Sequence, residues 1–254
     1  MFKKDLFLQS RFLNSAGSLG FAPDLRSEQG LFKLAAFITN PISLVRRRPV
    51  NTRNCLPFDG GFLLHSGFPN PGIRAVLKTC APRWAAAPIP VIPHLIAFAP
   101  DEIERMVRLI EGLENVTGVE IGLPEGIDPH LAAELVSRAF GELSVIACLP
   151  FEDALSLARF LRDDPITAFS LSAPRGTLPG PDGSLVNGRL YGPAVLPTAL
   201  RVVSQLAREG ITVFGSGGVY SRQDADAMLS AGASAVQLDT VFWGVEGVNI
   251  LAGW

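Results

Sequence analysis

Short apolar segments alternate with longer amphipathic segments along the 254-residue chain, and this alternation predicts an α/β protein with the (β/α)8 (TIM) barrel fold. Several short segments are apolar at almost every position, which is typical of parallel strands covered by helices. No linker or internal repeat divides the sequence, so residues 1–254 are expected to form a single domain. A doubly wound open sheet is the alternative, and eight predicted strands make it the less economical one.

The predicted elements follow one another in strand–helix order. Apolar residues at Ile103, Met106 and Ile110 predict a helix with one core-facing side, and Asp128 followed by Pro129 predicts the start of another. The predicted strands are residues 12–16, 35–39, 91–98, 116–123, 143–149, 166–172, 211–215 and 235–238, and the predicted helices lie within residues 99–113, 128–140, 153–164, 195–210 and 221–232.

Two long segments interrupt this order. Residues 41–58 follow the second predicted strand, and residues 174–191 follow the sixth. Both would leave the carboxyl ends of strands, which form the catalytic face of such a barrel. They are therefore expected to be loop insertions on that face that act as lids or site walls.

Composition restricts the class of protein. The chain is 48% hydrophobic and 18% charged, which provides a large core and excludes a disordered chain. A net charge of −2 gives no overall electrostatic attraction to nucleic acid or to an anionic membrane. The three arginines at 46–48 are a local exception and are expected in a solvated loop or a subunit contact. No signal-peptide core or membrane-spanning apolar run is present, so no membrane partner is expected.

The three cysteines, Cys55, Cys80 and Cys148, have no metal-ligand spacing, so no metal site is predicted. Their odd number and scatter favour a reduced, cytoplasmic protein.

A glycine cluster, "GSGGV", ends the predicted strand at residues 211–215. Glycines at a strand end let backbone approach a ligand closely, often a phosphate. A tight strand-to-helix turn without a ligand explains the cluster equally well.

Several segments, in the same order, resemble the dihydroorotate dehydrogenase family of FMN-dependent (β/α)8 barrels. They are "FLNSAGSLGF" at 12–21, "FITNPISLVRRRPVNTRN" at 37–54, "HSGFPNPGIRAVL" at 65–77, "NGRLYGPAVLPTALRVV" at 187–203 and "VFGSGGVYSRQDADAMLSAGASAVQLDT" at 213–240. The resemblance extends from about Leu6 to Thr240, and the last two segments are the most specific.

The resemblance implies FMN as cofactor, with its phosphate on the backbone at Gly217 and Gly218 and its ring against Gly17. Backbone N–H groups at a helix start favour a phosphate, and missing Cβ atoms let it approach. The cofactor-binding residues implied in this way are Ala16, Gly17, Thr39, Asn40, Ser170, Gly188, Arg189, Gly192, Gly217, Gly218, Asp239 and Thr240.

The sequence departs from the family where the chemistry takes place. Asn40 stands where the family has a lysine, and the second family lysine is replaced by Ala147 or Cys148. "VEIGLPEG" replaces the asparagines that bind the orotate ring, and no catalytic base is found near residues 123–127. Asp239 replaces a phosphate-site glycine, where a carboxylate would repel a phosphate. A substrate other than dihydroorotate is therefore expected.

Three other residues are candidates for catalysis. Strand alternation places Glu120 inside the barrel, where it is either an active-site carboxylate or half of a structural ion pair. His65 is either an acid–base group or a hydrogen-bonding residue of its turn, and Ser172 ends a strand with Ser170 on the same face. Arg189 replaces a family glycine and is a candidate for the positive charge lost with the lysines. His94 and Cys148 are expected to be core residues.

Three functions stay open from the sequence. The first is an FMN-dependent oxidoreductase acting on a small-molecule substrate other than dihydroorotate. The second is a non-redox lyase or isomerase that binds a phosphorylated metabolite. The third is a catalytically silent paralogue that acts as a subunit of a complex, and a homodimer is also compatible with the sequence.

Overall fold

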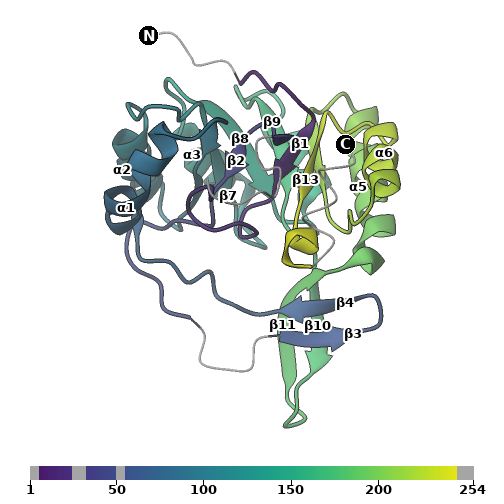
Figure 1. Ribbon diagram of the computed structural model, residues 1–254. Coiled ribbons are helices and arrows are strands. Elements are labelled where there is room, and N and C mark those ends of the chain that lie inside the picture. The colour runs from purple at the N-terminus through teal and green to yellow at the C-terminus, as the bar shows by residue number, and fades with distance from the viewer. Residues whose placement is uncertain (1–5, 25–32, 50–54, 245–254) are drawn as a thin grey trace.

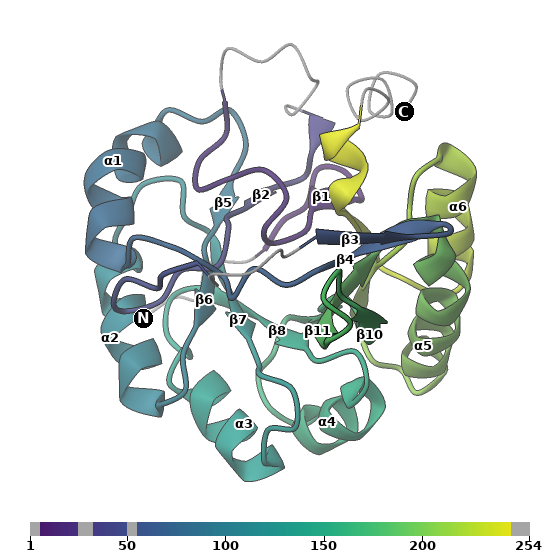
Figure 2. The same cartoon turned by 90° about the horizontal axis from the view of Figure 1, so that it is seen from below.

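The computed structural model describes residues 6–24, 33–49 and 55–244. Its centre is a curled parallel sheet with helices on the outside, the arrangement of an α/β barrel (Figures 1 and 2). Seven strands are hydrogen-bonded in the order β1-β13-β12-β9-β8-β7-β6. They are β1 (Phe12–Asn14), β6 (His94–Ile96), β7 (Gly118–Gly122), β8 (Ser144–Leu149), β9 (Ala168–Leu171), β12 (Val213–Ser216) and β13 (Ala235–Leu238).

The remaining part of the ring is joined more loosely. Strands β2 (Phe37–Ile38) and β5 (Val91–Ile92) form a separate parallel pair. Single bridges connect Leu13 to Ala36 on one side and Val91 to Val116 on the other. Ladders do not extend through these junctions, so closure into a full eight-stranded barrel stays a prediction.

Proline explains one difference from the expected strands. The segment expected as one strand at 91–98 is divided into β5 and β6 by Pro93, which has no N–H for a sheet ladder. The backbone N–H of the next residue, His94, instead donates to Thr39 Oγ1 at 3.0 Å. The strand expected at 235–238 has those bounds, the one expected at 211–215 is shifted to Val213–Ser216, and the others are shorter than expected.

All five expected helices are found, together with one that was not expected. In α2 (Pro100–Ile110), the predicted stripe is buried, and Asp128 caps α3 (Pro129–Ser137) by accepting from the N–H of His130 at 3.0 Å. The others are α4 (Ala154–Leu161), α5 (Leu196–Arg208) and α6 (Arg222–Ser230). The unexpected helix is α1 (Ile73–Ala85), which contains Pro82 and buries Trp84 completely.

The second predicted insertion forms a second sheet with residues 55–64, which begin at the end of the first insertion and extend beyond it, at one end of the barrel (Figure 1). It is antiparallel, in the order β10-β11-β4-β3, and the fold class did not predict it. Its strands are β3 (Cys55–Phe58), β4 (Gly61–Leu64), β10 (Arg175–Pro179) and β11 (Leu185–Tyr191). Short 3-10 helices, η2 (Pro193–Val195) and η3 (Thr240–Trp243), follow β11 and β13.

Buried residues form two cores. The larger core lies between the strands and the helices and includes Trp84, Met106 and Val145. The smaller core includes Leu13, Ile146 and Phe214, which alternate with outward-facing neighbours and so fill the inside of the curled sheet. None of the helices in the described part of the chain combines the length and apolar character that crossing a membrane requires.

Candidate functional site

A cavity of about 430 Å³ opens at the carboxyl ends of the parallel strands, beside the antiparallel sheet. Strand residues Glu120 and Gln237 lie in its wall, together with Arg47, Arg175 and Arg189 from the two insertions. Residues of both insertions that were expected to form site walls therefore line this cavity. The cavity is also lined by Ala16, Phe68, His94, Phe98, Glu125, Cys148, Ser172, Tyr191 and Asp239.

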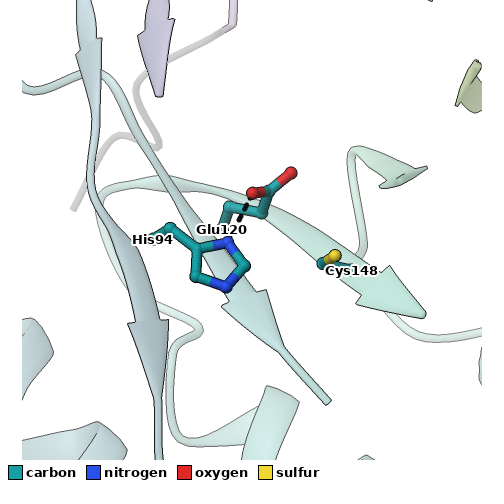
Figure 3. A group of neighbouring side chains, drawn as sticks. All are labelled: His94, Glu120 and Cys148. Atoms are coloured by element: carbon teal, nitrogen blue, oxygen red, sulfur yellow. Dashed lines mark hydrogen bonds and ion pairs between the residues drawn. The ribbon is translucent and has the colours of Figure 1, made fainter. Parts of the chain in front are cut away.

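Glu120 is the centre of a buried polar network inside the sheet. Its side chain is nearly inaccessible, as the alternation in β7 predicts. One oxygen lies 2.5 Å from His94 Nδ1 (Figure 3), and the other accepts from Ser170 Oγ at 2.6 Å and Gln237 Nε2 at 2.9 Å. These partners come from β6, β9 and β13, so the network ties together strands on different sides of the sheet.

The network keeps Glu120 charged. Burial by itself raises the pKa of this carboxyl, but the hydrogen bond and charge of His94 and the bonds from Ser170 and Gln237 outweigh it, so the pKa is lowered. A buried carboxylate with this many donors is stable as an anion. The arrangement can orient His94 and hold a proton next to the cavity.

Cys148 lies beside this pair (Figure 3), and its sulfur, a His94 nitrogen and a Glu120 oxygen all lie within 4.8 Å of one another. These are ligand types that suit zinc. Both oxygens of Glu120 are already engaged by protein donors, and burial followed by the Glu120 charge raises the pKa of the Cys148 thiol. The group therefore favours a protonated thiol beside an ion pair.

Asp239 is a second buried carboxyl on the cavity wall. Burial raises its pKa to about 6. Hydrogen bonds from the backbone N–H and hydroxyl of Thr240, and from the N–H groups of Gly218 and Val241, stabilise the charged form and limit this rise. Thr240 Oγ1 donates to its carboxylate at 3.2 Å, and Tyr220 Oη lies 2.6 Å from the same hydroxyl. Two of the residues expected to hold a phosphate, Gly218 and Thr240, therefore stabilise the protein's own carboxylate.

Two of the three arginines on the cavity wall are stacked on aromatic rings. Arg189 lies 4.0 Å from the centre of the Phe68 ring, and Arg47 lies 5.6 Å from the centre of the Phe98 ring. Burial lowers the pKa of Arg189, although a guanidinium stays charged at any ordinary pH. The third, Arg175, forms an ion pair with Glu125 at 3.0 Å.

The structure brings only part of the predicted site together. Five predicted residues line the cavity: Ala16, Glu120, Ser172, Arg189 and Asp239. Ser170 joins them through its bond to Glu120. The remaining predicted residues do not line it, namely Gly17, Thr39, Asn40, His65, Gly188, Gly192, Gly217, Gly218 and Thr240.

Several of these outlying residues have a clear role in the fold. Thr39 is fully buried and accepts from the His94 N–H, and Asn40 Oδ1 accepts from the Gly20 N–H at 3.0 Å. A Cβ on Gly218 would lie 2.4 Å from the backbone nitrogen of Leu196, and one on Gly192 would lie 2.3 Å from the Gly60 carbonyl oxygen. Close backbone packing thus requires both glycines, with or without a ligand.

Gln237 and Phe68 are the main site residues that sequence reasoning missed. Gln237 was detectable, because it is a polar residue between the apolar Val236 and Leu238 in a buried strand, on the same face as Asp239. Phe68 gave no signal, because it lies outside both predicted insertions and its contact with Arg189 joins segments far apart in the sequence. His94 and Cys148, expected in the core, are buried as expected but also line the cavity.

The fold and the position of the cavity define an α/β barrel with a candidate active site at the carboxyl ends of its strands. Comparisons with known proteins agree with this class. A crystal structure of DHODH in complex with ferulenol from Eimeria tenella superimposes with a TM-score of 0.73 at 13% sequence identity, covering 96% of this chain and 80% of that chain. This likeness concerns the fold.

Sequence comparisons give a more specific resemblance. A family model for dihydroorotate dehydrogenase matches residues 181–252. The catalytic subunit of dihydroorotate dehydrogenase B (NAD(+)) from Trichlorobacter lovleyi is 29% identical over 259 residues, covering 92% of this chain and 84% of the relative. The protein of the same name from Pelobacter propionicus matches with the same identity and coverage. The chain therefore resembles the dihydroorotate dehydrogenase family, as its motifs predict.

Proposed function

We propose that this chain is a dihydroorotate dehydrogenase-like oxidoreductase that acts on a substrate other than dihydroorotate. The resemblance over nearly the whole chain supports the class of reaction. The observation that carries the change of substrate is the composition of the cavity. Where the family has two lysines and a set of asparagines, this cavity has Cys148 and the His94–Glu120 pair.

FMN is the cofactor that the resemblance implies, and its two ends fit the site differently. The cavity, with Ala16 in its wall, has room for a flat ring system at the strand ends. The phosphate end does not fit, because the N–H groups of Gly218, Thr240 and Val241 already stabilise the Asp239 carboxylate. A dianion placed there would meet a buried negative charge. We therefore infer that FMN binds this chain weakly, and we assign no step of a reaction to it.

The protein's own groups suggest how a substrate would be handled. His94, oriented by Glu120, and the Ser172 side chain would contact a molecule in the cavity. The protonated Cys148 would contribute shape rather than a nucleophile.

Asp239 and Cys148 together favour a second candidate, a barrel without redox chemistry. In this case the chain would act as a non-redox enzyme or as a silent subunit of a complex. The named relatives are catalytic subunits, so association with another protein subunit, or with a second copy, is part of both proposals. We also propose a cytoplasmic location, because Cys55, Cys80 and Cys148 are all free thiols.

The visible absorption spectrum of the purified protein separates the two candidates. Bound oxidised flavin gives a yellow protein and supports the oxidoreductase. A protein that takes up no FMN even at high micromolar concentration supports the barrel without redox chemistry, because the oxidoreductase is expected to bind FMN weakly. The control is a spectrum of released cofactor after denaturation, which shows whether any colour belongs to flavin.

A further inference from the structure

We propose that Arg189, held against the ring of Phe68, binds a carboxylate group of the ligand that occupies the cavity. This assigns Arg189 to the ligand rather than to the flavin. It rests on the proposed function only in that the ligand is taken to be the substrate.

The position of Arg189 is fixed by the antiparallel sheet. It lies in β11, where it pairs with Arg175 on one side and Leu64 on the other. The preceding residue, Gly188, packs so closely that a Cβ there would lie 2.5 Å from the Leu63 side chain. Because both neighbouring strands restrain the backbone, the guanidinium is directed at the cavity by a rigid element.

Phe68 is held in an unusual conformation that places its ring beneath Arg189. Its φ of 53° is in the left-handed region, which a bulky residue rarely adopts, and Gly67 before it has a φ of 69°. Asn70 Nδ2 donates to the Phe68 carbonyl at 3.1 Å, and Asn70 Oδ1 accepts from the N–H of Gly72 at 3.0 Å. A strained residue fixed by its surroundings is a common feature of ligand sites.

The charges around the cavity leave Arg189 without an acidic partner. Three carboxylates line the cavity, and each has other partners: Glu120 has His94, Glu125 has Arg175, and Asp239 has Thr240. Among the described residues, no acid forms an ion pair with Arg189, whose close contact is the Phe68 ring. A guanidinium in this position has N–H donors available for an incoming anion.

The geometry favours a carboxylate among the anions. Stacking on Phe68 covers one face of the guanidinium and leaves its edge free, and this edge matches a planar carboxylate with two parallel hydrogen bonds. A phosphate dianion would bring twice the charge into a cavity that also holds Glu120 and Asp239. Arg47, stacked on Phe98 in the same cavity, would add to the attraction for a monoanion.

Pairs of small carboxylates and their uncharged amides test this assignment. The probes are acetate with acetamide, benzoate with benzamide and succinate with succinamide, at millimolar concentration and constant ionic strength, and inorganic phosphate is the competing anion. We expect at least one carboxylate to raise the melting temperature of the protein while its amide does not. Calorimetric titration with that carboxylate then gives the affinity of each variant.

Arg189→Gln should weaken carboxylate binding by at least about tenfold, which corresponds to about 1.4 kcal/mol. Arg189→Lys should recover part of the loss, and Phe68→Leu should weaken binding by about threefold because the charge stays but its support is lost. Arg208→Gln, at the exposed end of α5, is the matched control and should bind as the wild type does. Melting temperatures without ligand identify any variant that fails to fold. If Arg189→Gln does not fold, the affinities of Arg189→Lys and Phe68→Leu decide the assignment.

Three results would overturn the assignment: no stabilisation by any carboxylate, equal stabilisation of wild type and Arg189→Gln, or stronger Arg189-dependent stabilisation by phosphate. The outcome is separate from that of the proposed function. A colourless protein without redox activity that binds carboxylates through Arg189 contradicts the proposed function alone. A yellow protein that binds carboxylates equally well with and without Arg189 contradicts this assignment alone.

Discussion

Glu120 accepts a hydrogen bond from Gln237 Nε2 at 2.9 Å, although 117 positions separate the two residues in the sequence. Glu120 lies on β7 and Gln237 on β13, and the bond crosses the inside of the curled sheet. Together with His94 and Ser170 it forms the polar floor of the cavity. This network both stabilises the barrel and places an acid–base pair, His94 and Glu120, in the wall of the cavity.

Replacing Glu120 should therefore destabilise the protein. Glu120→Gln removes the charge that pairs with His94 and places an amide among donors, so we expect a loss of about 3 kcal/mol in the free energy of unfolding, measured with urea at pH 7. Glu104→Gln is the control, because Glu104 forms its ion pair with Arg138 at the surface, and it should lose less than about 1 kcal/mol.

The same variant has a defined pH dependence. The pKa of Glu120 is lower in the folded protein than its usual value of 4.5, so its stabilising effect is complete above pH 4.5 and is lost as the pH falls below it. The difference between wild type and Glu120→Gln should shrink on acidification in this range. A difference independent of pH would contradict the charged network.

Asp239 should have the opposite pH dependence. Its folded pKa of about 6 lies above the usual 3.8, so the folded state binds a proton first as the pH falls, and stability rises through pH 6 until the gain is complete below about 3.8. Relative to Asp239→Asn, the wild type should gain about 1 kcal/mol between pH 7 and pH 5. Equal slopes for the two proteins would show that Asp239 is not a buried, destabilised carboxylate.

Substitution of Gly218 should destabilise the fold, whereas its motif indicates an effect on phosphate binding. The phosphate hypothesis expects Gly218→Val to impair ligand binding while the barrel stays folded. With a φ of 75° and Leu196 nitrogen 2.4 Å from a Cβ, even Gly218→Ala should cost about 2 kcal/mol or more of stability. Gly112→Ala, where a Cβ meets nothing within 4 Å, is the control. Equal melting temperatures for the two variants would contradict the packing argument.

No oxidation of dihydroorotate is expected from the purified protein with quinone, fumarate or NAD as acceptor, even after FMN is added. The cavity offers Cys148, His94 and Glu120 in place of the lysines, asparagines and catalytic base of the family. A coupled absorbance assay with an authentic dihydroorotate dehydrogenase as positive control measures this. Clear turnover with any acceptor would show that the cavity retains a working dihydroorotate site.

The sequence predicted the order of elements well, because strand and helix periodicities are local properties. It also placed Glu120 inside the sheet, since alternation in β7 leaves its side chain on the face away from Val119 and Ile121. The antiparallel sheet was not predictable, because it pairs β11 with β4, which lies more than a hundred residues away in the sequence. For the same reason the contact of Arg189 with Phe68 could be found only in three dimensions.

The glycine-rich phosphate motif shows a different limit. Gly217 and Gly218 match the family in sequence, and their positive φ values fit a turn with or without a ligand. What decides the chemistry is Asp239, whose carboxylate is stabilised by the N–H of Gly218 from the motif and by the N–H groups of Thr240 and Val241. A motif gives the backbone of a site, whereas the charge that occupies it depends on a residue from another strand.

Titration of FMN into wild type and Asp239→Gly, followed by quenching of flavin fluorescence at low ionic strength, tests the central claim most directly. We expect weak binding by wild type and at least about tenfold tighter binding by Asp239→Gly, with a difference that shrinks as salt is added. Failure of both proteins to bind FMN at high micromolar concentration would contradict the flavin-dependent oxidoreductase and leave the barrel without redox chemistry in its place.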